Sequence, residues 1–144
     1  MRIVLCHGTF DLLHVGHLKL FESARKLGDR LIVTLTADIH VNKGRGRPIY
    51  SQSERAYAIS RIKDVDTVEI CHDRTGLPMI EKWQPDVYVK GMDYKTADKH
   101  GSLGVEQKAV EAYGGKVVLV DTPRYSSSSL IERVAGWDEA RRRR

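Results

Sequence analysis

The chain has 144 residues, of which 41% are hydrophobic and 30% charged, with two cysteines and a formal net charge of +5. This length fits one domain with a sizeable core, and two cysteines are too few for a disulfide-built scaffold. Four of the 24 basic residues are the terminal Arg141–Arg144, so the rest of the chain carries 20 basic and 19 acidic residues, a net charge of +1. That near balance argues against a nucleic-acid partner. We expect a cytoplasmic protein without a membrane-spanning segment, because no apolar run reaches the necessary length.

The first half of the chain predicts strands and helices in alternation. Apolar and β-branched runs indicate strands, and apolar residues at helical spacing indicate helices. In order, the sequence predicts a strand at 3–5, a helix over 15–27, a strand at 30–35, a basic loop over 38–50, a helix over 54–62 and a strand at 66–70. Gly28 ends the first helix, and Ser51 or Ser53 caps the second.

The second half continues the alternation. It predicts a short helix over 76–83, a strand at 87–89, a helix over 103–113, a strand at 116–120 and a last helix over 127–134. Alternating strands and helices predict an α/β fold with a doubly wound parallel sheet. We expect a single domain over residues 1–136 and a basic, mobile tail over 137–144.

Two histidines stand where the first strand leads into the first helix. His14 and His17 are three residues apart, with Gly16 between them and Asp11 just before. Residues at this spacing share a helix face, and the free N–H groups of a helix start suit phosphate. Gly16 lets a ligand approach the backbone closely. The pattern predicts a phosphate held by two imidazoles at a helix N-terminus.

The two alternatives for these histidines are a packed core position and a zinc site. Cys6, His7, His14 and His17 are plausible zinc ligands, but closed zinc sites usually contain tight cysteine pairs, and the second cysteine is the distant Cys71. The chain has no Gly-x-x-x-x-Gly-Lys-Ser/Thr loop and no Gly-x-Gly-x-x-Gly turn. Their absence argues against P-loop kinases and ordinary dinucleotide-dependent dehydrogenases.

The run Gly-Thr-Phe-Asp-Leu-Leu-His-Val-Gly-His, residues 8–17, resembles the signature of the nucleotidyltransferase superfamily with the HxGH motif, which includes the cytidylyltransferases. Residues 123–131, Pro-Arg-Tyr-Ser-Ser-Ser-Ser-Leu-Ile, resemble its second signature, a Ser/Thr triplet that opens a helix. The resemblance extends from Arg2 to about Val134. It implies a five-stranded Rossmann-like sheet in the order 3-2-1-4-5, which brings the end of the first strand beside the end of the fourth.

Within the superfamily, residues 43–49, 85–95 and 112–117 look like the adenylyltransferase domain of ADP-heptose synthase. The Pro-Arg pair before the serines is similar to glycerol-3-phosphate cytidylyltransferase. We therefore expect nucleotidyl transfer from a nucleoside triphosphate, ATP favoured, to a sugar 1-phosphate such as heptose 1-phosphate, with release of pyrophosphate. The alternative is CTP with glycerol 3-phosphate or a similar alcohol phosphate. A flavin-nucleotide synthetase fits residues 89–94 poorly, and the intact motifs argue against a non-catalytic nucleotide-binding module.

The resemblance also implies individual roles. The implied catalytic residues are His14, His17, Lys43, Arg55 and Arg124. The implied nucleotide-binding residues are Gly8, Thr9, Phe10, Asp11, Gly16, His17, Lys90, Gly91, Asp93, Arg124, Ser127, Ser128 and Ser129. Alternatives are a solvated basic loop for Lys43, Arg45 and Arg47, a surface salt bridge for Arg55, a surface position for Lys90 and plain helix capping for the serines. We expect Mg²⁺ to arrive with the triphosphate, without a protein metal site, and we expect a homodimer.

Overall fold

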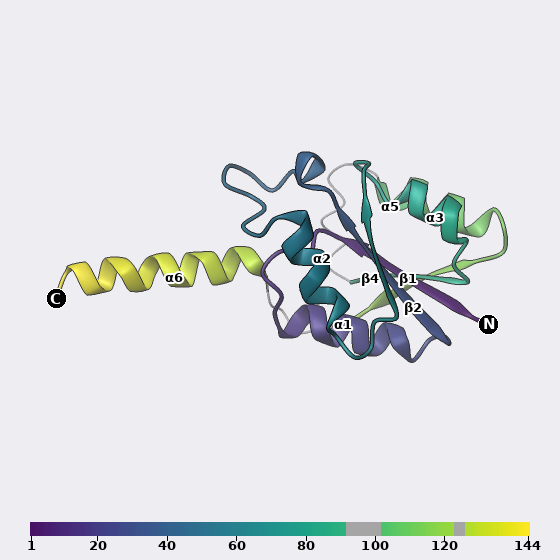
Figure 1. Cartoon of the computed structure of the whole chain (residues 1–144), viewed down its shortest axis with the longest axis horizontal. Coiled ribbons are helices and arrows are strands. Elements are labelled where there is room, and N and C mark those ends of the chain that lie inside the picture. The colour runs from purple at the N-terminus through teal and green to yellow at the C-terminus, as the bar shows by residue number, and fades with distance from the viewer. Residues whose placement is uncertain (92–101, 123–125) are drawn as a thin grey trace.

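The computed structural model describes residues 1–91, 102–122 and 126–144, and at its centre lies an all-parallel sheet (Figure 1). The strands are β1 (Ile3–Gly8), β2 (Arg30–Thr36), β3 (Thr67–Cys71), β4 (Val87–Gly91) and β5 (Lys116–Val120). Their order is β3-β2-β1-β4-β5. The predicted fold class and strand order are confirmed. The order reverses between β1 and β4, which is where ligands bind in open sheets of this kind.

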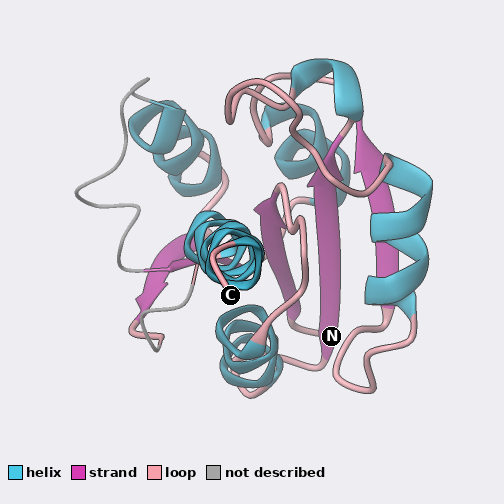
Figure 2. Cartoon of the chain, turned by 90° about the vertical axis from the view of Figure 1, so that its left-hand side faces the viewer, coloured by secondary structure: helices cyan, strands magenta, loops and turns pink. Residues whose placement is uncertain are grey.

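Helices cover both faces of the sheet (Figure 2). On one face lie α1 (Val15–Arg25) and α2 (Gln52–Ser60), and on the other lie α3 (Leu77–Trp83) and α5 (Ser102–Glu111). A short 3-10 helix, η1 (Asp38–His40), follows β2. These four helices form within a few residues of their predicted bounds.

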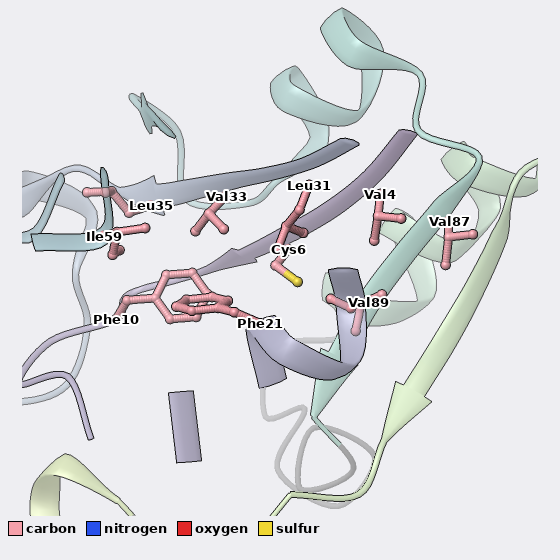
Figure 3. Close-up of a cluster of buried hydrophobic side chains, with 11 residues drawn as sticks. Val4, Cys6, Phe10, Phe21, Leu31, Val33, Leu35, Ile59, Val87 and Val89 are labelled. Carbon is pink, nitrogen blue, oxygen red and sulfur yellow. The ribbon is translucent and has the colours of Figure 1, made fainter. Parts of the chain in front are cut away.

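The core consists of two apolar layers, one on each face of the sheet. Val4 and Cys6 of β1 pack with Phe21 and Ile59 from α1 and α2, as Figure 3 shows for the cluster on that face. Leu5, which lies between them in the sequence, packs on the opposite face. Alternate residues of a strand point to opposite faces, so a strand buried on both sides is a continuous apolar run. This is why the central strands were recognisable from sequence.

Strand β1 is longer than the predicted segment 3–5, because it continues through His7 and Gly8. His7 pairs with Thr34 and Gly8 with Leu35 in the register with β2. The buried His7 ring is accommodated by a 2.9 Å hydrogen bond between its Nδ1 and Thr34 Oγ1. A buried polar group is tolerated when it is hydrogen-bonded. The sheet therefore reaches directly to the loop that contains the histidine motif.

The last helix, α6 (Ser127–Arg142), runs eight residues beyond its predicted end and projects from the body of the domain (Figure 1). Its residue Gly136 does not end the helix, and an Arg142–Asp138 ion pair at 3.2 Å lies in its last turns. None of its residues is buried, and Trp137 is 63% exposed. Among the described residues, no helix combines the length and the apolar character that crossing a bilayer requires.

Candidate active site

His14 and His17 begin helix α1 as a reciprocal cap. His14 is the N-cap residue, and its Nδ1 accepts a hydrogen bond from the N–H of Gly16 at 3.0 Å. The N–H of His14 donates to Nδ1 of His17 at 3.3 Å, and the two rings stack with centroids 3.8 Å apart. Because both Nδ1 atoms accept, the neutral rings carry their proton on Nε2. The cap thus fixes both imidazoles in the tautomer whose Nε2 is a hydrogen-bond donor.

Burial favours the neutral form of both rings. Burial lowers the pKa of His14 below its usual value. Burial, followed by the neighbouring His14 and Lys43, lowers the pKa of His17 to about 4, although Asp11 opposes the shift. Protonating both stacked rings would place two positive charges side by side, which is electrostatically unfavourable. Burial and the cap therefore both favour the neutral ring that carries its proton on Nε2.

The loop between β1 and α1 holds two residues in the left-handed region. Phe10 has φ 52° and Leu12 has φ 51°, values that non-glycine residues adopt at an energetic cost. The Phe10 ring packs edge-on against His17, with centroids 5.6 Å apart, and against Phe21 at 5.1 Å. A Cβ on Gly8 would lie 3.0 Å from the Phe10 ring. Gly8 therefore makes room for the ring that supports His17.

Arg55 lies buried beneath this loop and not at the surface of the site. The side chain is 1% exposed, and it donates to the carbonyls of Tyr50 (3.0 Å), Thr9 (2.8 Å) and Thr36 (2.8 Å) and to Asp38 Oδ1 (2.7 Å). These partners come from the histidine loop, the end of β2, η1 and the segment before α2. Arg55 thus fastens four segments at the carboxyl edge of the sheet. Its predicted contact with phosphate stays a prediction.

Asp11 fastens the basic loop to the histidine loop. Its carboxylate accepts from Arg47 Nε at 3.0 Å and from the backbone N–H groups of Ile49 at 2.7 Å and Tyr50 at 3.0 Å. Burial acts to raise the pKa of Asp11, but these donors and the charge of Arg47 outweigh it, so the pKa lies below its usual value. The solvated basic loop, the alternative for Arg47, is excluded by this contact, and no local sequence pattern indicates a partner 36 residues away.

The basic loop and the serine helix converge on the same place. Burial and the nearby Arg47 lower the pKa of Lys43, while Asp11 opposes the shift, and Lys43 in turn lowers the pKa of His17. At the start of α6, Ser127 Oγ donates to the backbone carbonyl of Asp11, and Arg47 Nη1 donates to Ser128 Oγ at 3.4 Å. The structure therefore brings Lys43 and the first turn of α6 beside the histidine cap.

Ser129 contributes to the cap of α6. Its N–H donates to Ser126 Oγ at 3.0 Å, and the two hydroxyl oxygens lie 2.7 Å apart. Ser126, which the sequence prediction omitted from the site, is the N-cap residue. A helix start capped in this way still presents backbone N–H groups, so capping and phosphate binding are compatible.

The predicted residues around the end of β4 are only partly described. Lys90 is 2% exposed, and its Nζ donates to the carbonyl of His7 at 2.7 Å. Gly91 is the last residue of β4. Asp93 and Arg124 lie outside the described residues. The predicted contacts of these residues with nucleotide are untested.

Glu106, which sequence reasoning missed, lies 4.0 Å from Lys90 and is also 2% exposed. The sequence does contain a signal for a buried Glu106. Glu106 falls three residues after Leu103 and four before Val110, on the apolar side of the predicted helix over 103–113. An acidic residue on an apolar helix face calls for a buried partner.

Within the described residues, no three His, Cys, Asp or Glu side chains form a group that could hold a metal ion. Of the zinc candidates, Cys6 is a buried free thiol, and burial raises its pKa to about 12. His7 is bonded to Thr34, and burial together with Lys90 lowers its pKa to about 3.

Known proteins share this sequence pattern over most of its length. The cytidylyltransferase-like family matches residues 5–133. The bifunctional protein HldE of Koribacter versatilis (strain Ellin345) is 45% identical over 135 residues, which cover 92% of this chain and 27% of the relative. HldE of Nitrobacter hamburgensis is 42% identical over 139 residues, covering 94% of this chain and 27% of the relative. The chain thus spans about a quarter of the length of these curated relatives.

Solved structures share the fold. The lipopolysaccharide core biosynthesis protein from Thermoplasma volcanium GSS1 superposes with a TM-score of 0.67 at 28% identity, covering 88% of this chain and 99% of the other. Pantothenate synthetase from Thermus thermophilus has a TM-score of 0.60 at 19% identity, covering 87% of this chain and 57% of the other, and it shares the fold alone. The family match spans the histidine cap, the basic loop and the start of the serine helix, and the chain belongs to the cytidylyltransferase-like family of nucleotidyltransferases.

Proposed function

We propose that this chain transfers the adenylyl group of ATP to a sugar 1-phosphate, such as heptose 1-phosphate, and releases pyrophosphate. The observation that carries the proposal is the pair of imidazoles fixed as Nε2–H donors at the start of α1. The choice of acceptor is supported by the similarity to HldE and by the resemblance of residues 43–49 and 85–95 to the adenylyltransferase domain of ADP-heptose synthase.

In this reaction an acceptor phosphate oxygen attacks the α-phosphorus, and the bond from that phosphorus to the bridging oxygen of pyrophosphate breaks. A phosphate monoester is an adequate nucleophile at neutral pH, so no strong base is needed. The protein contributes positioning and charge stabilisation. His14 and His17 donate from Nε2 to phosphate oxygens as negative charge shifts toward the leaving group. The N–H groups around Thr9 and Phe10 face the triphosphate.

The remaining phosphates are held by basic groups and by the start of α6. Lys43 approaches over the histidine cap on the loop that Asp11 fastens, and Ser127, Ser128 and Ser129 contribute hydroxyl and N–H donors. We assign Arg124 to the β- and γ-phosphates on the basis of the resemblance. Mg²⁺ enters as part of the substrate. The Asp11 carboxylate already accepts three N–H bonds, which favours delivery of the ion with the triphosphate over a protein-built site.

The base and ribose are assigned to the segment that begins at Gly91 and includes Asp93. A backbone edge without a side chain can hydrogen-bond a base, and a carboxylate can accept from a ribose hydroxyl or an exocyclic amine. The second candidate is a cytidylyltransferase that uses CTP and glycerol 3-phosphate. It is favoured by the Pro123-Arg124 pair before the serines.

A screen of pyrophosphate release tests the proposal directly. Each of the four common nucleoside triphosphates is combined with Mg²⁺ and a panel of sugar and polyol phosphates. We expect ATP with a sugar 1-phosphate to give the highest kcat/KM. Turnover only with CTP and glycerol 3-phosphate would establish the second candidate instead. No release with any combination would indicate a nucleotide-binding module without catalysis.

We also infer that two copies of the chain pair through an apolar groove of about 580 Å³ beside α6. Leu130, Ile131 and Val134 of α6 line one side of the groove, and Ala58 of α2 with the histidine loop lines the other. An isolated helix of this length is marginal in water. A second copy that covers this groove would supply the packing that α6 otherwise lacks.

A further inference from the structure

A buried ion pair lies at the end of β4, below the crevice assigned to the nucleotide. Lys90 and Glu106 are each 2% exposed, with Lys90 Nζ 4.0 Å from Glu106 Oε2. Removing two charges from water costs more free energy than most such pairs return, so a buried pair is weak evidence for stability. The pair is therefore better explained by the segments that it holds in place.

Glu106 connects α5 to two other elements. Its Oε1 accepts from the N–H of Gly76, the N-cap residue of α3, at 2.8 Å, and its Oε2 accepts from Tyr88 Oη of β4 at 2.8 Å. Gly76 packs tightly here, because an added Cβ would lie 3.0 Å from Tyr88 Oη and 3.1 Å from the His7 ring. Each oxygen of the carboxylate thus accepts from a protein donor, which fixes the carboxylate in position.

Lys90 occupies the point where β1 and β4 part. The pairing of these two strands ends at Cys6 and Val89. With their other neighbours the two strands stay paired further along: β1 pairs with β2 as far as Gly8, and β4 pairs with β5 as far as Gly91. Just beyond the last β1–β4 pair, the carbonyl of His7 accepts from Lys90 Nζ at 2.7 Å. A side-chain ammonium therefore binds this carbonyl where the ladder with β4 has stopped.

We propose that Lys90 is a positioning residue that links the carboxyl ends of β1 and β4 where their backbone pairing stops, and so fixes their spacing, with Glu106 as its fixed counter-charge. The gap between these strand ends is the switch point of the sheet, where ligands enter folds of this kind. The His7 carbonyl precedes Gly8 and Thr9 directly, so fixing it also fixes the start of the histidine loop. Lys90 then acts on the nucleotide through the backbone and not by direct contact. The inference rests on the proposed function only in assigning the nucleotide to this crevice.

The test uses four variants of the full chain: Lys90→Met, Glu106→Gln, their combination, and Lys82→Met as the matched control. Lys82 pairs with Glu69 at the surface, with its side chain 53% exposed. The Gln side chain keeps polar groups next to Gly76 and Tyr88 but removes the charge. We expect each single variant to lower Tm more than the combination does, because each removes one charge of the buried pair and keeps the opposite charge in the same place.

The variants should affect activity and stability differently. We expect Lys90→Met to lower kcat about tenfold with less than a threefold change in the triphosphate KM, and the combined variant to regain Tm but not kcat. A large rise in KM for one substrate with kcat retained would show direct ligand contact and overturn the proposal. A combined variant with the wild-type kcat would also overturn it.

Amide hydrogen exchange in the nucleotide-free protein tests the inference independently of catalysis. We expect the amides of Gly8 and Thr9 to exchange several times faster in Lys90→Met than in the wild type, and to be unchanged in Lys82→Met. Equal protection in Lys90→Met and the wild type would refute a positioning role. If the wild type releases no pyrophosphate, the proposed function fails, whereas the exchange result still decides the role of Lys90.

Discussion

Arg55 Nη1 donates a hydrogen bond to the carbonyl of Thr9 at 2.8 Å, across 46 residues of chain. The same guanidinium also bonds to three other segments, through Tyr50, Thr36 and Asp38, so one buried side chain holds the loop that carries the histidines. The position of the histidine cap therefore depends on a residue that lies outside the first strand–helix unit.

Arg55→Lys should lower the free energy of unfolding by about 2–4 kcal/mol, because an ammonium lacks the planar fork that serves four acceptors at once. Urea unfolding measures the loss. The matched control is Arg61→Lys at the exposed end of the same helix, which should change the free energy of unfolding by less than about 0.5 kcal/mol. Similar values for both variants would contradict the role of Arg55.

His14→Asn should separate helix capping from catalysis. Asparagine is a good N-cap residue, so α1 should keep its stability, but the Nε2–H donor is lost. We expect kcat to fall about 10²–10³-fold with a smaller change in the triphosphate KM. His14→Ala should lose about 1 kcal/mol of stability as well. The exposed His72→Asn serves as the control, and near-normal turnover of His14→Asn would remove the central claim about the site.

Stability should fall in mild acid because of two histidines. Burial lowers the pKa of His7 to about 3 and that of His17 to about 4, against 6.5 for the unfolded chain. Between pH 6.5 and 4 the unfolded chain binds protons that the folded protein excludes, so the free energy of unfolding decreases as pH falls. As the pH rises above 6.5, the contribution of these two groups to the slope fades, because the unfolded chain also loses its protons.

The expected slope in that window is roughly 1.5–2.5 kcal/mol per pH unit, measured by urea unfolding at a series of pH values. His17→Gln should reduce the slope, whereas His72→Gln at the exposed surface should retain it. A flat profile between pH 6.5 and 4 in the wild type would be inconsistent with neutral, buried imidazoles.

Gly8→Ala should impair the site through Phe10. The new methyl group would lie 3.0 Å from the Phe10 ring, and displacing that ring removes the support of His17. We expect kcat to fall about tenfold or more, since small misplacements of reacting groups are costly. Gly136→Ala on α6 meets nothing within 4 Å and should stabilise its helix by up to about 1 kcal/mol without loss of activity. Equal activity of both variants would contradict the packing argument.

Pairing of two copies should depend on the exposed apolar residues of α6. Val134 is 60% exposed and Trp137 is 63% exposed. We expect the wild type to sediment as a dimer at micromolar concentration and the combined variant Val134→Ser/Trp137→Ser to sediment as a monomer. Glu132→Gln on the same helix should remain dimeric. A wild type that is monomeric and fully active would refute the inferred pairing.

The fold was predictable because its signals are local. The buried strands appear as apolar runs such as 31–33, and helices such as 54–62 have their own caps. The end of β1 was not predictable in the same way, since His7 is polar and is buried only through Thr34 on another strand. The length of α6 escaped prediction because its second half has little apolar periodicity and is formed by residues that favour helices and by ion pairs.

In the site, too, contacts within one segment were predictable from the sequence, whereas contacts between distant segments were not. The pairing of His14 with His17 follows from a spacing of three residues, so the motif itself predicts two imidazoles on one helix start. The partners of Asp11 lie 36 to 39 residues away on the basic loop, and Glu106 meets its partners through α5 packing. Such contacts depend on how helices, strands and loops pack together. The spacing of residues within one segment carries no information about that packing.

The hydroxyl of Ser127 reaches the carbonyl of Asp11 across 116 residues. During synthesis the first strand and helix emerge early, and the sheet can assemble before α6 is made. The left-handed residues of the histidine loop cost energy, and the contacts that hold the loop come from Arg55, from residues 47–50 and from the first turn of α6. The loop therefore acquires its final shape only after the last of these segments has arrived. A nascent chain can thus be folded for some time before it is able to bind its substrate. A series of ribosome-stalled chains truncated on either side of Ser127 would show that delay. Nucleotide binding would rise in a step along the series, whereas protease resistance would show no matching step.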